Sequence, residues 1–240
     1  MKINWNYIKG TVLLGFVAFL YSFSNQKNSV IKVREIVIEF EEGNNLFMNY
    51  QIVNKLLIQN NTTVKNQAKS VIDLHQLEAN VLSHPMVEDA AIFLTVDGLL
   101  KAKIKQRTPI ARVLSNTRSY YIDKQAKKMP LSENYSARVL LVSGDVNEGD
   151  IEEIHYLVTA ILNDEFLKKQ LISIKKMPNN EFILNTRVGD QKIVLGNTTN
   201  LNQKFKKLKS FFNKTMADKT IEKYSAINLK YNNQVVCTKK

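Results

Sequence analysis

Residues 87–105 read VEDAAIFLTVDGLLKAKIK and predict a β-hairpin. The pair Asp97–Gly98 is a strong signal for a two-residue turn between antiparallel strands. In the second strand, Leu100, Ala102 and Ile104 alternate with lysines at 101, 103 and 105, so one face is apolar and the other is charged. The hairpin therefore belongs to a small sheet with one buried face.

The residues that precede this hairpin complete a compact unit. Residues 31–40 alternate in polarity and predict a strand, and residues 49–59 have the apolar spacing of a helix. Asp73 is a favourable N-cap for a second helix, which Pro85 ends. We expect Leu77 and Val81 of that helix to face the core. The predicted order β-α-α-β-β places two helices on one face of the sheet.

The chain changes character after Thr108-Pro109. We predict a β-rich domain over residues 108–240, in which two helices at 151–162 and 201–217 pack on the sheet. Its predicted strands are 110–114, 120–123, 129–131, 137–143, 171–176, 181–185, 191–195 and 226–231. The last of these is followed by a turn at Asn232-Asn233. The predicted fold class is α+β.

The N-terminal segment predicts one transmembrane helix. Residues 10–26 carry no charge, and residues 11–23 are almost wholly apolar. Residues 1–9 would form a cytoplasmic tail, because lysines precede the span without a compensating acid, and the later domains would then be extracytoplasmic. The alternative is a cleaved signal peptide, which the bulky Tyr21 and Phe23 disfavour. The residues that we expect to anchor the helix in the bilayer are Trp5, Tyr7, Lys9, Leu13, Phe16, Phe19 and Tyr21.

Charge is distributed unevenly in a chain whose net charge is +12. Residues 30–110 contain equal numbers of basic and acidic side chains, whereas residues 111–240 contain 22 basic and 13 acidic side chains. An extracytoplasmic location argues against nucleic acid as the partner. We expect Lys204, Lys207 and Lys214 on the helix at 201–217 to contact an anionic partner or surface. The alternative is a solvated basic face without a specific partner.

The sequence gives no pattern typical of a catalytic or metal site. His75, His84 and His155 have no metal-ligand spacing, and Cys237 is the single cysteine. Glu41-Glu42 and Glu152-Glu153 are adjacent pairs whose side chains diverge, which is unsuitable for acid–base catalysis. We therefore predict a non-enzymatic protein with no cofactor, no metal and no small-molecule substrate.

These features together resemble the FtsQ/DivIB family of bacterial cell-division proteins. VLSHPMVEDAAIF at 81–93 is similar to the family's helix–proline–strand junction, and LKAKIKQRTPIARV at 100–113 to the end of its POTRA domain. SYYIDKQAKKMPLS at 119–132 is similar to the first hairpin of its β domain, although Ala126 stands near where glycine is frequent. INLKYNNQVV at 227–236 is similar to its terminal strand, although Asn228 and Lys230 stand where Asp and Arg are frequent.

The resemblance implies a POTRA domain at 30–107, a β domain at 108–240, and a scaffold at the division septum of the bacterial inner membrane. Its partners would be divisome membrane proteins of the FtsB/FtsL type and FtsK-type septal proteins, besides the lipid bilayer. Partner binding by strand addition would involve Tyr224, Ile227, Asn228, Leu229, Lys230, Tyr231 and Asn232. Alternatives are a POTRA-bearing chaperone or secretion component for outer-membrane proteins, a wall-binding ectodomain, or a terminal strand that only completes the sheet.

Overall fold

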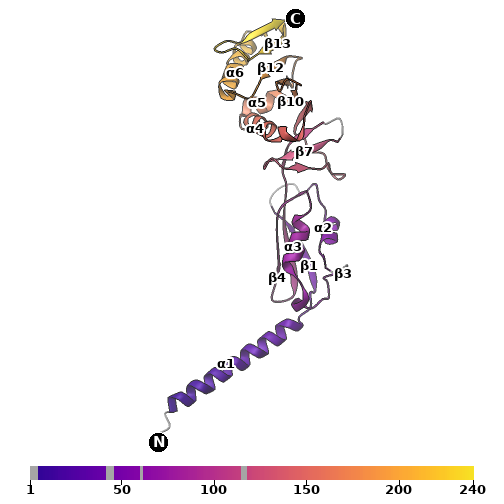
Figure 1. The fold of residues 1–240 in the computed structure, drawn as a ribbon, viewed down its shortest axis with the longest axis vertical. Helices are drawn as coiled ribbons and strands as arrows, with labels where there is room; N and C mark the ends of the chain where they lie inside the picture. The colour runs from indigo at the N-terminus through magenta and orange to yellow at the C-terminus, as the bar shows by residue number, and fades with distance from the viewer. Residues whose placement is uncertain (1–4, 42–45, 60–61, 115–117) are drawn as a thin grey trace. The chain divides into compact units, whose positions relative to one another are not determined.

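The computed structural model describes residues 5–41, 46–59, 62–114 and 118–240, and the chain divides into two compact units at Gln106–Arg107. The first unit holds α1 and an α+β domain, and the second is β-rich (Figure 1). The first unit's elements are α1 (Trp5–Val30), β1 (Glu35–Phe40), α2 (Tyr50–Leu56), β2 (Ile58–Gln59), β3 (Thr62–Thr63), η1 (Lys69–Val71), α3 (Leu74–Leu82), β4 (Val87–Leu94) and β5 (Leu99–Gln106).

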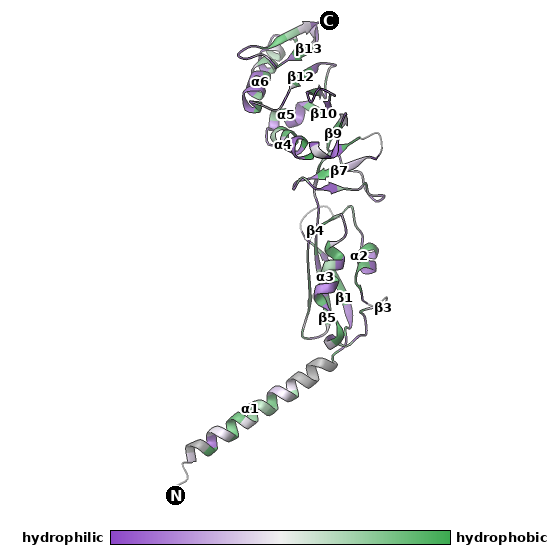
Figure 2. Cartoon of the chain, viewed as in Figure 1, coloured by the Kyte–Doolittle hydropathy of each residue, from purple (hydrophilic) through white to green (hydrophobic). Residues whose placement is uncertain are grey.

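The predicted transmembrane anchor is wrong. Among the described residues, none of the helices combines the length and the apolar character that crossing a membrane requires. The apolar run at 11–23 would extend about 20 Å as a helix, short of the ~30 Å of a bilayer's hydrocarbon core. Figure 2 shows green, white and purple segments along the described part of α1. The expected anchor residues Trp5, Lys9, Leu13, Phe16, Phe19 and Tyr21 are exposed on this helix, and the side chain of Tyr7 lies outside the described part.

The hairpin that decides the first unit forms, but four residues, 95–98, separate its strands in place of the predicted two-residue turn. β4 and β5 pair antiparallel around Asp97–Gly98, and β1 adds parallel to β5, which gives the sheet order β1-β5-β4. Asp73 caps α3 by accepting a hydrogen bond of 3.0 Å from the backbone N–H of Gln76. α3 packs against β4 (Figure 1), and Leu77 and Val81 of this helix are fully buried.

The second unit is one mixed nine-stranded sheet with the order β14-β13-β12-β11-β10-β9-β6-β7-β8. Its strands are β6 (Pro109–Val113), β7 (Tyr120–Asp123), β8 (Lys128–Met129), β9 (Leu140–Gly144), β10 (Leu171–Lys176), β11 (Phe182–Thr186), β12 (Lys192–Gly196), β13 (Tyr224–Asn228) and β14 (Val236–Lys239). Its helices are η2 (Glu148–Asp150), α4 (Ile151–Leu162), α5 (Glu165–Gln170), α6 (Leu201–Ala217) and η3 (Ile221–Lys223).

Helices join two of the strand pairs that are parallel. The segment with α4 and α5 connects β9 to β10, and the segment with α6 connects β12 to β13. Parallel neighbours need such crossovers because a tight hairpin can join only antiparallel strands. The prediction of two packed helices is therefore incomplete, since α5 is a third.

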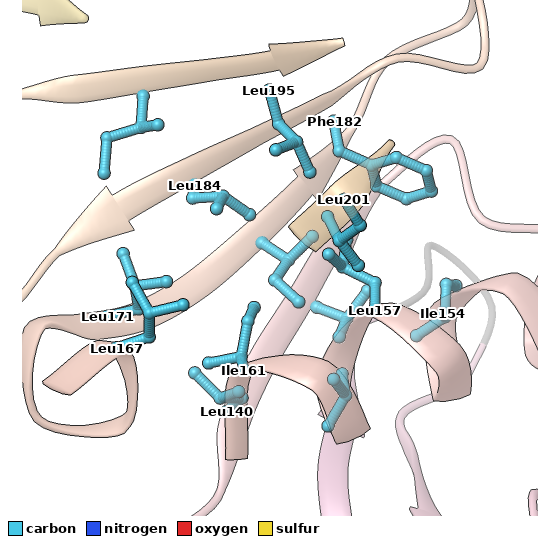
Figure 3. Close-up of a cluster of buried hydrophobic side chains, with 14 of the residues drawn as sticks. Leu140, Ile154, Leu157, Ile161, Leu167, Leu171, Phe182, Leu184, Leu195 and Leu201 are labelled. Atoms are coloured by element: carbon cyan, nitrogen blue, oxygen red, sulfur yellow. The ribbon is translucent and has the colours of Figure 1, made fainter. Parts of the chain in front are cut away.

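One hydrophobic core holds this sheet and its helices together. Figure 3 shows Ile154, Leu157 and Ile161 of α4 pointing toward Leu184 of β11 and Leu195 of β12. All five side chains are fully buried, and they belong to a cluster that also includes residues of α5 and α6. Fully burying an aliphatic side chain contributes about 1.5–3 kcal/mol relative to exposure, so this shared core holds the helices against the sheet.

The first hairpin of the second unit turns at Ala126. Asp123 is almost fully buried, accepts hydrogen bonds of 2.8 Å from the N–H groups of Gln125 and Lys127, and pairs with Arg107 at 2.7 Å. Ala126 has φ 61°, a left-handed conformation that glycine adopts more readily. The carboxylate of Asp123 therefore stabilises a turn that alanine would otherwise disfavour.

Candidate interaction surface at the last strand

The last strand, β14, forms one end of the nine-stranded sheet. It pairs antiparallel with β13, and within the described part of the chain the sheet continues on that side only. An edge strand presents a row of backbone N–H and C=O groups that a further strand can pair with. Val236, Thr238 and Lys239 of β14 are exposed, so side chains do not cover this edge.

The position of the edge corrects the sequence analysis. Residues 226–231 were expected to form the exposed final strand, but β13 ends at Asn228 and lies between β12 and β14. Ile227 is opposite both Ile193 and Cys237, and the N–H of Leu229 donates to the C=O of Val194 at 2.9 Å. The backbone of this segment is therefore already paired, and β14 takes its place as the edge.

The residues predicted to bind a partner fall into two groups. Ile227 and Leu229 are fully buried, and Tyr224 makes an edge-on ring contact with Phe211 of α6, so these three side chains hold β13 against the helix. Lys230, Tyr231 and Asn232 are exposed in the turn toward β14, while Asn228 accepts a hydrogen bond of 3.0 Å from the N–H of Lys230. A partner would reach the second group without disturbing the core.

A basic hollow of about 370 Å³ adjoins this turn. We call it the lysine hollow. Its lining residues are Asn197, Thr199, Asn200, Gln203, Lys204, Lys206, Lys207, Leu229, Lys230, Asn232 and Asn233. The fold thus brings the predicted Lys204 and Lys207 of α6 together with Lys230 and Asn232. It places Lys214 in the last turn of α6, exposed and away from this hollow.

Lys204 differs from the solvated lysine that the sequence suggested. It is buried, and its Nζ donates to the C=O and the side-chain oxygen of Asn197 at 2.8 and 3.0 Å. Burial, together with the charge of neighbouring Lys207, lowers the pKa of Lys204 from its ordinary value. Its positive charge is held in place by a loop that precedes α6, which helical periodicity alone does not reveal.

Two other lysines of the hollow, Lys207 and Lys230, are also positioned by hydrogen bonds or an ion pair. Lys207 Nζ donates to the C=O of Leu229 at 3.2 Å and also to that of Tyr231, which ties α6 to the turn before β14. Lys230 pairs with Glu181, and this hydrogen bond lowers the pKa of the Glu181 carboxyl. A surface with several fixed cations and few acids favours an acidic ligand.

The histidines do not form a metal-binding arrangement in the part of the chain that the structure describes. His155 Nε2 lies 3.0 Å from the C=O of Lys124, and His84 Nδ1 accepts from the N–H of Met86 at 3.3 Å. Burial lowers the pKa of His84 from its ordinary value. Among the described residues, His, Cys, Asp and Glu side chains do not gather in threes that could hold a metal ion.

A three-stranded α+β domain followed by a mixed sheet with an open edge is the architecture of a POTRA and β-domain protein. The family model for the FtsQ/DivIB C-terminal related domain matches residues 108–238, and the model for a POTRA-like domain matches residues 30–105. The chain therefore belongs to the FtsQ/DivIB family. A search of curated proteins found no match. The two domain types fit a cell-division scaffold and are generally non-enzymatic.

Proposed function

We propose that this protein is a scaffold of the bacterial divisome that recruits septal proteins to the division site. Its partners are membrane proteins of the FtsB/FtsL type, and FtsK-type proteins are further candidates. The partner adds a strand to β14 and brings acidic side chains to the lysine hollow. The single observation that carries this proposal is the open edge of β14 beside the lysine hollow.

Strand addition gives affinity through the backbone, and the lysine hollow gives selectivity. Backbone pairing alone accepts almost any extended segment, whereas charge opposite charge suppresses wrong partners. Lys206 is exposed at the rim of the hollow, and Lys207 lies beside the turn that leads into β14. A bound strand that continues past Val236 would therefore meet these lysines.

Proline substitutions test the backbone contribution. Successive N–H groups along a strand point to opposite edges, so one of Cys237→Pro and Thr238→Pro removes an outward donor and the other an inward one. The variant with the outward change should keep the wild-type melting temperature yet lose partner in co-purification from cross-linked membranes. If both variants melt like the wild type and retain the partner, strand addition at β14 is excluded.

Charge reversals on α6 test the lysine hollow. Lys206→Glu and Lys207→Glu should weaken partner retention by about 10-fold, and more so at low salt, because they place an acid opposite an acid. Lys214→Glu is the matched control, since it makes the same change on the same helix outside the hollow. Equal losses from all three would indicate a general charge effect. Co-purification of outer-membrane proteins in place of septal ones would instead support a chaperone role.

A further inference from the structure

A second concave surface lies where β9 and β10 begin, beside α5. It has a volume of about 840 Å³, and we call it the β9–β10 groove. Its lining residues are Arg138, Val139, Leu140, Leu141, Leu162, Glu165, Lys168, Lys169, Leu171, Ile172 and Arg187. Four strands of the sheet order separate β9 from β14, so this groove is distinct from the edge and the lysine hollow.

The floor of the groove is apolar and firmly supported. Leu141 and Ile172 each keep 39% of their surface exposed, although they lie on adjacent strands of a well-packed sheet. Leu140 and Leu171 beside them are buried and point into the core (Figure 3). The floor therefore cannot close by collapse. An apolar side chain that covers it removes apolar surface from water, which favours binding.

The rim of the groove is basic. Arg138, Lys168, Lys169 and Arg187 contribute four positive charges, against one negative charge from Glu165. Arg187 Nε donates to the C=O of Lys169 at 3.0 Å, which holds the guanidinium at the rim. Glu165 pairs with Lys168 at 3.5 Å, whereas Arg138 and Lys169 have no carboxylate partner among the described residues.

We infer that the β9–β10 groove docks an acidic segment of another protein that inserts a large apolar side chain between the basic residues. Charge complementarity selects acidic flanks, and the exposed Leu141 and Ile172 select an apolar anchor. β9 is paired with β6 on one side and β10 on the other, so a partner cannot add a strand here and must bind through side chains. A purely acidic polymer would leave the apolar floor exposed to water, so it fits the groove less well than a segment with an apolar side chain.

Fluorescence polarisation with labelled peptides and the full-length chain tests this inference. The probe is a fluorescein-labelled octapeptide with a central Leu-Phe pair flanked by three acidic residues on each side. A second peptide replaces Leu-Phe by Ser-Ser, and a third replaces the acids by lysines. The first should bind at least about 10-fold more tightly than either of the others, because each lacks one of the two recognition elements.

Variants locate the binding site. Lys169→Glu and Leu141→Ser should each weaken binding of the first peptide by about 10-fold, by opposing its charge and by removing the apolar floor. Lys175→Glu is the matched charge control, on exposed β10 surface outside the groove, and Val96→Ser is the matched apolar control. Both should change affinity by less than about 2-fold. Thr238→Pro at β14 should leave this binding intact, which separates the two docking surfaces.

Four results would overturn the inference. The first is no binding of the Leu-Phe peptide. The second is equal affinity for the Ser-Ser peptide, which would mean that charge alone accounts for binding. The third is a loss of binding in Lys175→Glu as large as that in Lys169→Glu. Tighter binding of the chain to vesicles with phosphatidylglycerol than to the acidic peptide, abolished by Lys169→Glu, would assign the groove to lipid and contradict the inference.

Discussion

At the scale of single residues, Gly144 is a position at which a side chain has no room. It ends β9 with φ 98°, and a Cβ there would lie 2.0 Å from the C=O of Lys176. Gly144→Ala should therefore lower the free energy of unfolding of the second unit by about 1–3 kcal/mol. Urea unfolding measures this change. Gly149→Ala is the control, because a Cβ there meets no atom within 4 Å, and it should be nearly neutral.

Lys176 is a second residue on which the stability of this unit depends. It is 2% exposed, pairs with Asp150 at 3.0 Å and donates to the C=O of Asp145 at 3.1 Å, so it fastens β10 to the start of α4. Lys176→Met should cost about 3–5 kcal/mol, because it leaves a partly buried carboxylate unpaired. Lys176→Met with Asp150→Asn should cost about 1–3 kcal/mol less than the sum of the two single changes. Additive costs would mean that the ion pair contributes nothing.

The residue scale also shows where sequence reasoning about the candidate site stopped. The spacing on α6 identified its basic character, but Lys204 follows Leu201 on the buried side, and only the approach of the Asn197 loop explains its burial. The loop is close to Lys204 in sequence, but its conformation cannot be predicted from the spacing of apolar residues on α6. Asn200 and Asn233 adopt positive φ, and this local geometry shapes the hollow without a recognisable motif.

At the scale of elements, Asp164 links α5 to α6. It caps α5 by accepting from the N–H groups of Phe166 and Leu167, and it pairs with Lys209 of α6 at 2.6 Å. The hydrogen bond from Lys209 is the main cause that lowers the pKa of the Asp164 carboxyl from its ordinary value of 3.8. The unfolded chain therefore binds this proton more readily, so the stabilisation is complete above about pH 4–5 and is lost as pH falls through the lower folded pKa.

Asp164→Asn should remove the contribution of this carboxylate to the pH dependence of stability, while asparagine remains a good N-cap. Its free energy of unfolding should fall below that of the wild type by about 0.5–1 kcal/mol at pH 7, and the difference should shrink toward pH 2–3. Melting curves across this range provide the measurement. Lys209→Met should give the same profile, because it removes the other half of the pair. A difference that stays constant with pH would mean that the charge of Asp164 has no role.

Elements differ in how well the sequence predicted them. α4 and α6 begin and end at the predicted residues because apolar spacing over 12 and 17 residues is a strong local signal. α5 has 6 residues and β14 has 4, which is too short for periodicity to stand out, although Asp164 and Asn232-Asn233 mark their starts. The edge was assigned to the wrong strand because β14 was not recognised as a strand, although it follows β13 closely in sequence and pairs with it antiparallel.

At the scale of the whole molecule, charge and interaction surfaces coincide. Residues 30–110 are electrically balanced, and the basic surplus lies in residues 111–240, which contain both the lysine hollow and the β9–β10 groove. A scaffold that uses one domain for acidic partners can leave the other neutral for different contacts. The predicted anchor is wrong at this scale, because none of the described helices is both long enough and apolar enough to cross a membrane.

Two compact units with separate hydrophobic cores should unfold as two cooperative transitions. The large buried cluster draws its residues from 110–237 alone, whereas Leu77 is fully buried in the first unit between α3 and its sheet. Leu77→Ala should cost about 2–5 kcal/mol and lower one calorimetric transition by more than about 8 °C while leaving the other unchanged. Leu208→Ala on α6 is the reciprocal variant, since Leu208 is fully buried in the second unit, and it should lower only the other transition. If either variant shifts both transitions together, the two units fold as one, and a partner bound at β14 would then stabilise the POTRA-like domain as well.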